Sequence, residues 1–134
     1  MKPRTTKRSR GPVISIGSRT RRAGRTQLDE GAVAWAPPVD VYEADDHYVC
    51  NAEVPGVEAR DIRIEVDGNE LSIRGERRFD AVCSEENYQR LEGIRGRFHR
   101  SFTLPERLDH RAIRAELRDG VLEVILPKLP RARR

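Results

Sequence analysis

The stretch RAELRDGVLEVILPK, residues 114–128, carries the strongest structural signal in the sequence. Asp119-Gly120 at its centre favours positive φ at both positions, as a two-residue hairpin turn requires. Apolar residues alternate on both sides of this turn: Ile113, Ala115 and Leu117 before it, and Leu122, Val124 and Leu126 after it. Pro127 removes a backbone donor and should end the second strand. The stretch therefore predicts a β-hairpin.

Shorter alternating runs precede the hairpin. Apolar residues recur at every second position over residues 48–54 and 62–66, and a third run continues over residues 71–75. Asp67-Gly68-Asn69 separates the last two runs, and Pro37-Pro38 marks an edge strand that starts after it. No window shows a helical period. Short strands with this punctuation predict an antiparallel β-sandwich.

Four motifs occur in a fixed order along the chain. They are W-x-P-x-V-D-V-x-E (residues 35–43), V-P-G-V (54–57), F-x-R-x-F-x-L-P (98–105) and A-x-x-x-D-G-V-L (115–122). Taken together, they resemble the α-crystallin domain of the small heat-shock proteins, of the bacterial and plant type. The resemblance covers residues 35–128 and implies an all-β, immunoglobulin-like antiparallel sandwich. We expect a flexible basic arm at residues 1–34 and a short basic tail at 129–134.

The charges are divided between the ends and the body of the chain. Residues 1–28 hold nine basic residues and no acidic one, and residues 128–134 hold four basic residues. The body, residues 29–127, carries all 22 acidic residues against thirteen basic ones. A basic arm suggests nucleic-acid binding through phosphates, but no aromatic residue is interleaved to stack on bases. The composition therefore predicts a disordered, solvated arm and makes nucleic acid an improbable partner.

Compartment and cysteine use follow from the same composition. No apolar run approaches the ~20 residues that span a bilayer, and no apolar segment follows the basic N-terminus, so we expect a cytoplasmic protein without a membrane partner. Cys50 alternates with apolar residues and is predicted to be a small core residue. Cys83 lies in a charged stretch, where an inter-subunit or redox role is the alternative to a simple exposed thiol.

The resemblance also implies sites of assembly. In the family, an I-x-I tripeptide of the C-terminal extension docks into a neighbouring subunit's edge groove. Here the tail after Lys128 has no such tripeptide, and Ile14-Ser15-Ile16 in the arm is the obvious substitute. We expect the groove to lie between two strands and to be lined by Ile62, Ile64, Val66, Ile113, Ala115 and Leu117. A client-binding patch or an accidental apolar run are the alternatives for Val13–Ile16.

Dimerisation is the second implied site. Residues 77–95 form a long charged stretch without a strand or helix pattern. A loop of this length is uncommon inside a compact domain and usually has a function. Bacterial and plant members of the family send a strand from this loop to the partner's sheet; a merely mobile loop is the alternative. The predicted dimer interface therefore comprises Asn87, Tyr88, Gln89 and Leu91, together with Arg100, which matches the strand arginine of the family motif and is expected to face acidic residues.

Catalytic chemistry has little support in the sequence. His47, His99 and His110 lack metal-ligand spacing, and no phosphate-binding glycine pattern, nucleophile elbow or cofactor motif is present. The leading hypothesis is a non-enzymatic, ATP-independent holdase chaperone of the stress response. It would capture partly unfolded proteins and assemble as homodimers and larger homo-oligomers, with no cofactor. A binding adaptor of the CS-domain type and a nucleic-acid-associated protein are the alternatives.

Overall fold

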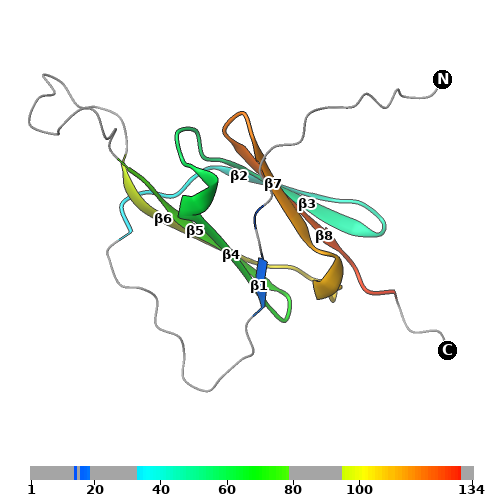
Figure 1. The fold of residues 1–134 in the computed structure, drawn as a ribbon. Helices are drawn as coiled ribbons and strands as arrows, with labels where there is room; N and C mark the ends of the chain where they lie inside the picture. The colour runs from blue at the N-terminus through cyan, green and yellow to red at the C-terminus, as the bar shows by residue number, and fades with distance from the viewer. Residues whose placement is uncertain (1–13, 15, 19–32, 79–94, 131–134) are drawn as a thin grey trace, which may run out of the picture.

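The computed structural model describes residues 14, 16–18, 33–78 and 95–130. Eight strands in these residues form two stacked four-stranded sheets, in the orders β1-β4-β5-β6 and β2-β3-β8-β7 (Figure 1). The strands are β1 (Ile16–Ser18), β2 (Val39–Glu43), β3 (His47–Glu53), β4 (Ile62–Asp67), β5 (Glu70–Arg77), β6 (Gly96–Thr103), β7 (Arg114–Arg118) and β8 (Val121–Pro127). Two 3-10 turns, η1 (Ala59–Asp61) and η3 (His110–Ala112), complete the described elements. The predicted all-β sandwich is confirmed.

The hairpin expected near the C-terminus joins β7 to β8. Asp119 and Gly120 have φ values of 53° and 79°, so both turn residues lie in the left-handed region. Arg118 pairs with Val121 directly beside the turn, and β8 ends at Pro127 as predicted. The carbonyl of Gly120 also accepts a hydrogen bond of 2.7 Å from the amide of Val54. The turn is therefore tied to the end of β3.

The core lies between the inner faces of the two sheets. Burial alternates residue by residue along β3, β4, β7 and β8, which is the period-two pattern seen in the sequence. Cys50 is 0% exposed and belongs to this core, as predicted. Tyr48 is 2% exposed, and its hydroxyl accepts a hydrogen bond of 3.1 Å from the amide of Glu106. Each large apolar side chain buried here contributes about 1.5–3 kcal/mol before entropy costs.

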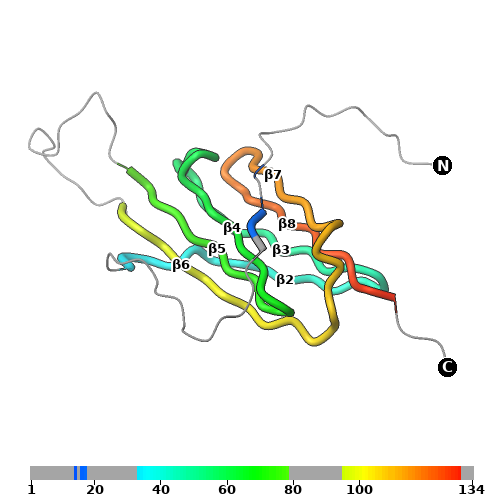
Figure 2. Tube along the Cα trace, turned by 60° about the horizontal axis from the view of Figure 1, so that its bottom comes forward, coloured from blue at the N-terminus to red at the C-terminus, as the bar shows by residue number. Residues whose placement is uncertain are grey.

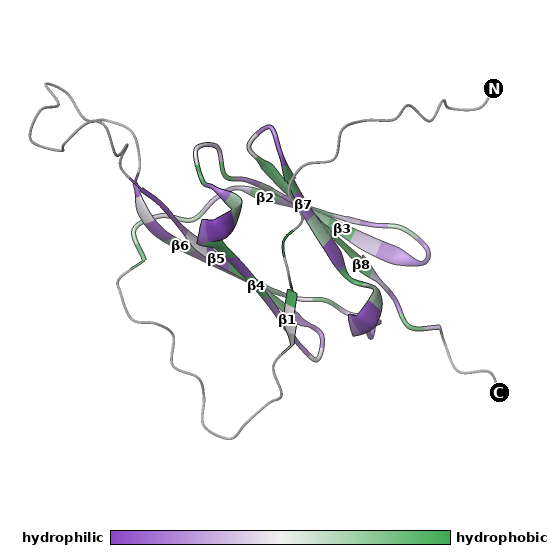
Figure 3. Cartoon of the chain, viewed as in Figure 1, coloured by the Kyte–Doolittle hydropathy of each residue, from purple (hydrophilic) through white to green (hydrophobic). Residues whose placement is uncertain are grey.

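Strand β1 departs from the antiparallel pattern. It pairs in parallel with β4, with Ile16 opposite Ile64, and so adds one strand at the edge of the sheet (Figure 2). Figure 3 shows hydrophobic colour on β1 where it lies along β4, whereas the two 3-10 turns are hydrophilic. Part of the stretch expected to be a solvated arm thus belongs to the sandwich. Two isoleucines at alternate positions are sufficient to form this short strand because the edge of β4 already offers it backbone partners.

Several predictions fall on residues outside those described. Asn87, Tyr88, Gln89 and Leu91 of the expected exchanged strand are among them, and so is Cys83. The arm is described only at residues 14, 16–18, 33 and 34, and the tail only at 129–130. The domain limits at residues 34/35 and 128/129 therefore stay predictions.

Candidate functional site

The predicted groove lies between one edge of each sheet. β4 supplies Ile62, Ile64 and Val66, and the edge strand β7 with its preceding residue supplies the second wall. All six side chains expected to line the groove are less than 10% exposed: Ile62, Ile64, Val66, Ile113, Ala115 and Leu117. They are inward-facing because each strand alternates, and at the edges the two sheets leave this apolar row open to a further segment. The structure thus buries all six of these side chains, while their role as a binding groove stays a prediction.

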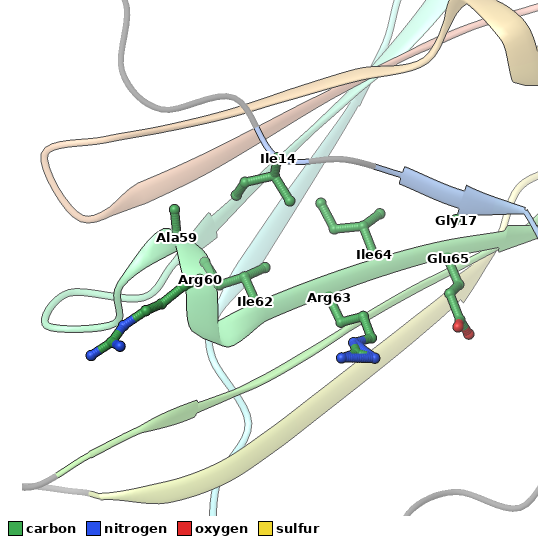
Figure 4. Close-up of a pocket in the computed structure, with 8 residues that line it drawn as sticks. All are labelled: Ile14, Gly17, Ala59, Arg60, Ile62, Arg63, Ile64 and Glu65. Carbon is green, nitrogen blue, oxygen red and sulfur yellow. The ribbon is translucent and has the colours of Figure 1, made fainter.

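Residues 14 and 16–18 of the same chain lie along this groove. The Ile14 side chain is only 7% exposed and lies opposite Ile62 and Ile64, with Ile64 pointing toward it (Figure 4). The amide of Ile14 donates a 3.2 Å hydrogen bond to the carbonyl of Ala115 on β7. Ile16 packs against the core and pairs with Ile64 on β4. One short segment therefore bonds to both sheets.

A pocket of about 500 Å³ remains beside the docked segment. Its apolar part comes from Ile14, Ala59, Ile62 and Ile64, and its polar part from Gly17, Arg60, Arg63 and Glu65. In Figure 4, Arg63 and Glu65 point to the opposite side of β4 from Ile62 and Ile64. The apolar floor therefore lies on the inner side of β4 and the charged side chains on its outer side, an arrangement that suits an extended peptide with branched side chains at alternate positions.

Two ion pairs involve residues that line this pocket. Arg60 lies 3.0 Å from Glu58, and Arg74 lies 3.8 Å from Glu65. Asp61, in η1 next to Ile62, accepts hydrogen bonds of 3.0 and 2.7 Å from the Nε and Nη2 atoms of Arg78. These bonds raise the pKa of Arg78 above its ordinary value. They also hold Arg78, which follows β5, against η1, which precedes β4. Sequence reasoning missed this contact because the β4–β5 hairpin lies between the two partners in the chain and neither belongs to a motif.

Arg100 lies on the face of β6 that turns toward the other sheet. Its Nη1 atom donates a 2.8 Å hydrogen bond to the carbonyl of Pro37, and its guanidinium lies 4.8 Å from the centre of the Phe102 ring. We expected acidic partners; within the described residues, the hydrogen bond of Arg100 goes to this carbonyl instead. Arg100 therefore ties β6 to the segment that leads into β2.

The two edges on this side of the sandwich differ. β6 is covered near its start by residues 34–35, where the amide of Ala34 donates to the Arg97 carbonyl at 2.8 Å and Trp35 pairs with Phe98. The guanidinium of Arg77 lies 4.1 Å above the Trp35 ring, and burial lowers the pKa of Arg77. β2 ends its sheet and exposes Val41 (42%) and Tyr42 (62%). Within the described part of the chain, β2 is the edge that presents large apolar side chains.

The three histidines lie apart from one another. His47 pairs with Asp46 at 2.8 Å, His99 contacts Ser72 at 3.2 Å, and His110 contacts the Gly68 carbonyl at 2.8 Å. Among the described residues, no group of three or more His, Cys, Asp or Glu side chains could hold a metal ion. No helix in the described ranges is long and apolar enough to cross a membrane.

Comparison with known proteins identifies relatives of this sandwich. Residues 40–134 match the model of the Hsp20/alpha crystallin family. The spore protein SP21 of Stigmatella aurantiaca is 37% identical over 101 residues, which are 75% of this chain and 60% of that protein. The 17.8 kDa class II heat shock protein of Zea mays is 38% identical, covering 81% of this chain and 66% of its own length. The chain thus spans less than two thirds of these curated relatives.

Solved structures share the same arrangement. The hspA structure from Xanthomonas axonopodis has a TM-score of 0.64 at 42% identity, covering 73% of this chain and 98% of that one. A small heat-shock protein from Xylella fastidiosa, described as having a distinct high order structure, gives 0.66 at 36% identity, with 76% and 95% covered. Together with the match over residues 40–134, these likenesses show that the chain belongs to the Hsp20/alpha crystallin family of small heat-shock proteins.

Proposed function

We propose that this protein is an ATP-independent holdase chaperone, which binds partly unfolded proteins, keeps them from aggregating and assembles from homodimers. The observation that carries the proposal is the groove between β4 and β7. It buries an aliphatic side chain of an extended segment and bonds to that segment's backbone from both walls. Backbone pairing is independent of sequence, so such a groove can accept many extended apolar segments.

Partly unfolded proteins expose such segments. A native protein buries its alternating apolar strands, whereas a partly unfolded one presents them together with unpaired backbone groups. Binding them requires neither a nucleotide nor a reacting group, since burial of apolar surface provides the driving force. Membership in the small heat-shock protein family supports this role.

The dimer is proposed to form at the open edge of β2. Among the described residues β2 pairs with β3 alone, and the exposed side chains of Val41 and Tyr42 on this edge suit an added strand. We propose that residues 87–91 of the partner subunit supply it and that Arg100 supports the interface by holding the segment before β2. Larger assemblies are proposed to form when Ile14 and Ile16 dock into the groove of another subunit.

Aggregation of a heat-labile model enzyme tests the proposed activity. Light scattering of the client at its denaturing temperature should fall steeply at about one subunit per client chain. The effect should be unchanged by apyrase or by added ATP. A folded globular protein of similar mass at equal concentration is the control. If the client aggregates as fast with this protein as with the control, the holdase proposal is wrong.

A further inference from the structure

We infer that Trp35 occupies a site for the aromatic side chain of an extended partner segment, and that such a segment enters when residues 34–37 leave the edge of β6. The inference rests on the proposed function in one respect: the partner is an apolar segment of a partly unfolded protein. It adds a second strand-binding edge, two strands away from β4 in the same sheet. It also names the side chain that this edge selects, a tryptophan or a tyrosine.

Three groups contact the Trp35 indole and together form what we call the aromatic site. The Nε1 atom of Trp35 donates a 3.0 Å hydrogen bond to the carbonyl of Gly96, and the guanidinium of Arg77 lies 4.1 Å from the ring centre. The third group is the ring of Phe98, which is 1% exposed and lies 5.0 Å away between ring centres. A flat ring with an N–H or O–H donor at its edge suits an acceptor, a cation and an aromatic wall at once. An aliphatic side chain offers neither the donor nor the ring face, so the site selects for tryptophan or tyrosine.

The backbone of β6 is paired with the same segment. The amides of Ala34 and Trp35 donate to one carbonyl, that of Arg97, at 2.8 and 3.3 Å. Trp35 also forms a parallel bridge with Phe98. Within the described residues β6 ends its sheet, and the cyan segment that leads into β2 lies beside the start of β6 (Figure 2). An incoming strand would therefore need the backbone partner as well as the aromatic site that Trp35 holds.

The attachment of residues 34–37 to β6 is short. Pro37 and Pro38 have no N–H group, so the segment offers β6 no backbone donor at these positions. The carbonyl of Pro37 accepts a 2.8 Å hydrogen bond from the side chain of Arg100. The carbonyl of Pro38 already belongs to the other sheet, where it accepts from the amide of Glu53, and β2 then pairs with β3 over five residues. Departure of residues 34–37 therefore breaks their contacts with β6 and leaves β2 paired.

A peptide that copies residues 33–37 tests the aromatic site directly. Val-Ala-Trp-Ala-Pro-amide with an N-terminal fluorescein is titrated with the full-length Trp35→Ala protein, and the fluorescence anisotropy of the peptide is recorded. This variant keeps the edge of β6 and vacates the place of the indole. The peptide should bind it at least about tenfold more tightly than it binds the wild-type protein, because Trp35 competes in the wild type.

A matched peptide and a second variant serve as controls. Val-Ala-Leu-Ala-Pro-amide should bind Trp35→Ala at least about tenfold more weakly than the tryptophan peptide, because it lacks the ring and its donor. Trp35→Phe keeps a ring in place but loses the donor to the Gly96 carbonyl, so the tryptophan peptide should displace it more readily than Trp35. Circular dichroism shows that each variant is folded. Equal binding of the tryptophan peptide to all three proteins, or equal binding of the two peptides, would overturn the inference.

Displacement in the wild-type protein is read from its own fluorescence. Trp35 is the single tryptophan of the chain, so its emission reports whether it still occupies the aromatic site. A client protein without tryptophan is unfolded by reduction of its disulfides and added to the wild-type protein. Entry of the client should shift the Trp35 emission to longer wavelength and increase its quenching by acrylamide, because the indole then meets water. Unchanged emission while the client sediments together with this protein would overturn the inference.

The chaperone proposal is judged separately, from suppression of client aggregation by the wild-type protein. A wild-type protein that fails to protect the client contradicts the holdase proposal, whichever peptide binds at the aromatic site. A protective protein whose Trp35 emission stays unchanged contradicts only the aromatic site.

Discussion

Arg100 is the residue whose role the structure defines most closely. Its charged hydrogen bond to the Pro37 carbonyl and its contact with the Phe102 ring hold the segment leading into β2. A hydrogen bond to a charged group contributes about 1.5–3 kcal/mol and the ring contact about 0.5–1 kcal/mol. Arg100→Ala should therefore lower the free energy of unfolding in urea by about 2–3 kcal/mol and weaken the proposed dimer.

The exposed neighbour Arg97 provides the matched control, and Arg97→Ala should change the free energy of unfolding by less than about 0.5 kcal/mol. Sedimentation equilibrium measures the dimer in the same samples. If Arg100→Ala leaves the dimer dissociation constant at the wild-type value, Arg100 is no part of the interface.

Gly75 is required by close packing. A Cβ atom at this position would lie 2.7 Å from Cζ of Phe98 and would also overlap the carbonyl of Asp61. Because one neighbour is backbone and the other is a buried ring, neither can move away cheaply. Gly75→Ala should lower the free energy of unfolding by about 1–3 kcal/mol, measured by chemical denaturation. Gly17→Ala is the control, since its new methyl group makes only ordinary contacts, and an equal loss in both variants would refute the packing argument.

Cys50 should be chemically silent in the folded protein. Burial raises the pKa of its thiol to about 11, and its side chain is 0% exposed. The thiolate, which is the reactive form, is therefore scarce at pH 8 and out of reach. In a Cys83→Ser variant, a thiol reagent such as DTNB should titrate no cysteine under native conditions and one in guanidinium chloride. Rapid native labelling would mean that β3 opens readily.

At the scale of elements, a deletion in the connection between β5 and β6 should abolish assembly and leave the fold intact. Arg77 and Gly96 are paired where the two strands end, so the chain must only bridge neighbouring strands there. Deleting residues 80–89 leaves enough residues to do so. We expect an unchanged far-ultraviolet circular dichroism spectrum and a monomer by sedimentation, because the proposed exchanged strand is lost. Loss of the spectrum together with the dimer would show instead that these residues belong to the core.

The assembly of the whole molecule should depend on the two isoleucines of the docked segment. Each buried isoleucine contributes about 1.5–3 kcal/mol before ordering costs, so the contact is weak singly and effective when repeated. Ile14→Ala with Ile16→Ala should reduce the light-scattering mass to that of dimers while circular dichroism shows a folded sandwich. Val33→Ala, a substitution at an exposed valine of the same stretch, is the control.

Salt adds a second readout to this comparison. The basic residues flanking residues 14–18 and the acidic body attract each other over about 10 Å at 0.1 M salt, but only over about 3 Å at 1 M. Wild-type assemblies should therefore be smaller at 1 M salt. An unaltered mass distribution in the double variant, at either salt concentration, would remove Ile14 and Ile16 from the assembly contacts.

The sequence alone determined the sandwich and the β7–β8 hairpin, and it indicated which residues of β4 and β7 face inward. These features follow from period-two alternation and turn chemistry, which act between residues close in the chain. They follow also from motifs whose order can be read directly in the sequence. Cys50 as a core residue follows from the same alternation. The sequence also suggested Ile14 and Ile16 as the groove's complement, since branched aliphatic residues at alternate positions suit a sheet edge, and this assignment stays a prediction.

Only the tertiary structure decided what these residues meet. Arg100 bonds to a carbonyl 63 residues away, and Asp61 meets Arg78, 17 residues away, at the open end of the β4–β5 hairpin; neither contact has a local signal. The sequence suggested that Ile14 and Ile16 dock in a neighbouring subunit's groove, and this stays a prediction; in the structure both residues pack beside β4 of their own chain. The reason is physical: strand patterns specify which faces become apolar, but which backbone and side-chain groups meet across the two sheets depends on how the strands are arranged in space.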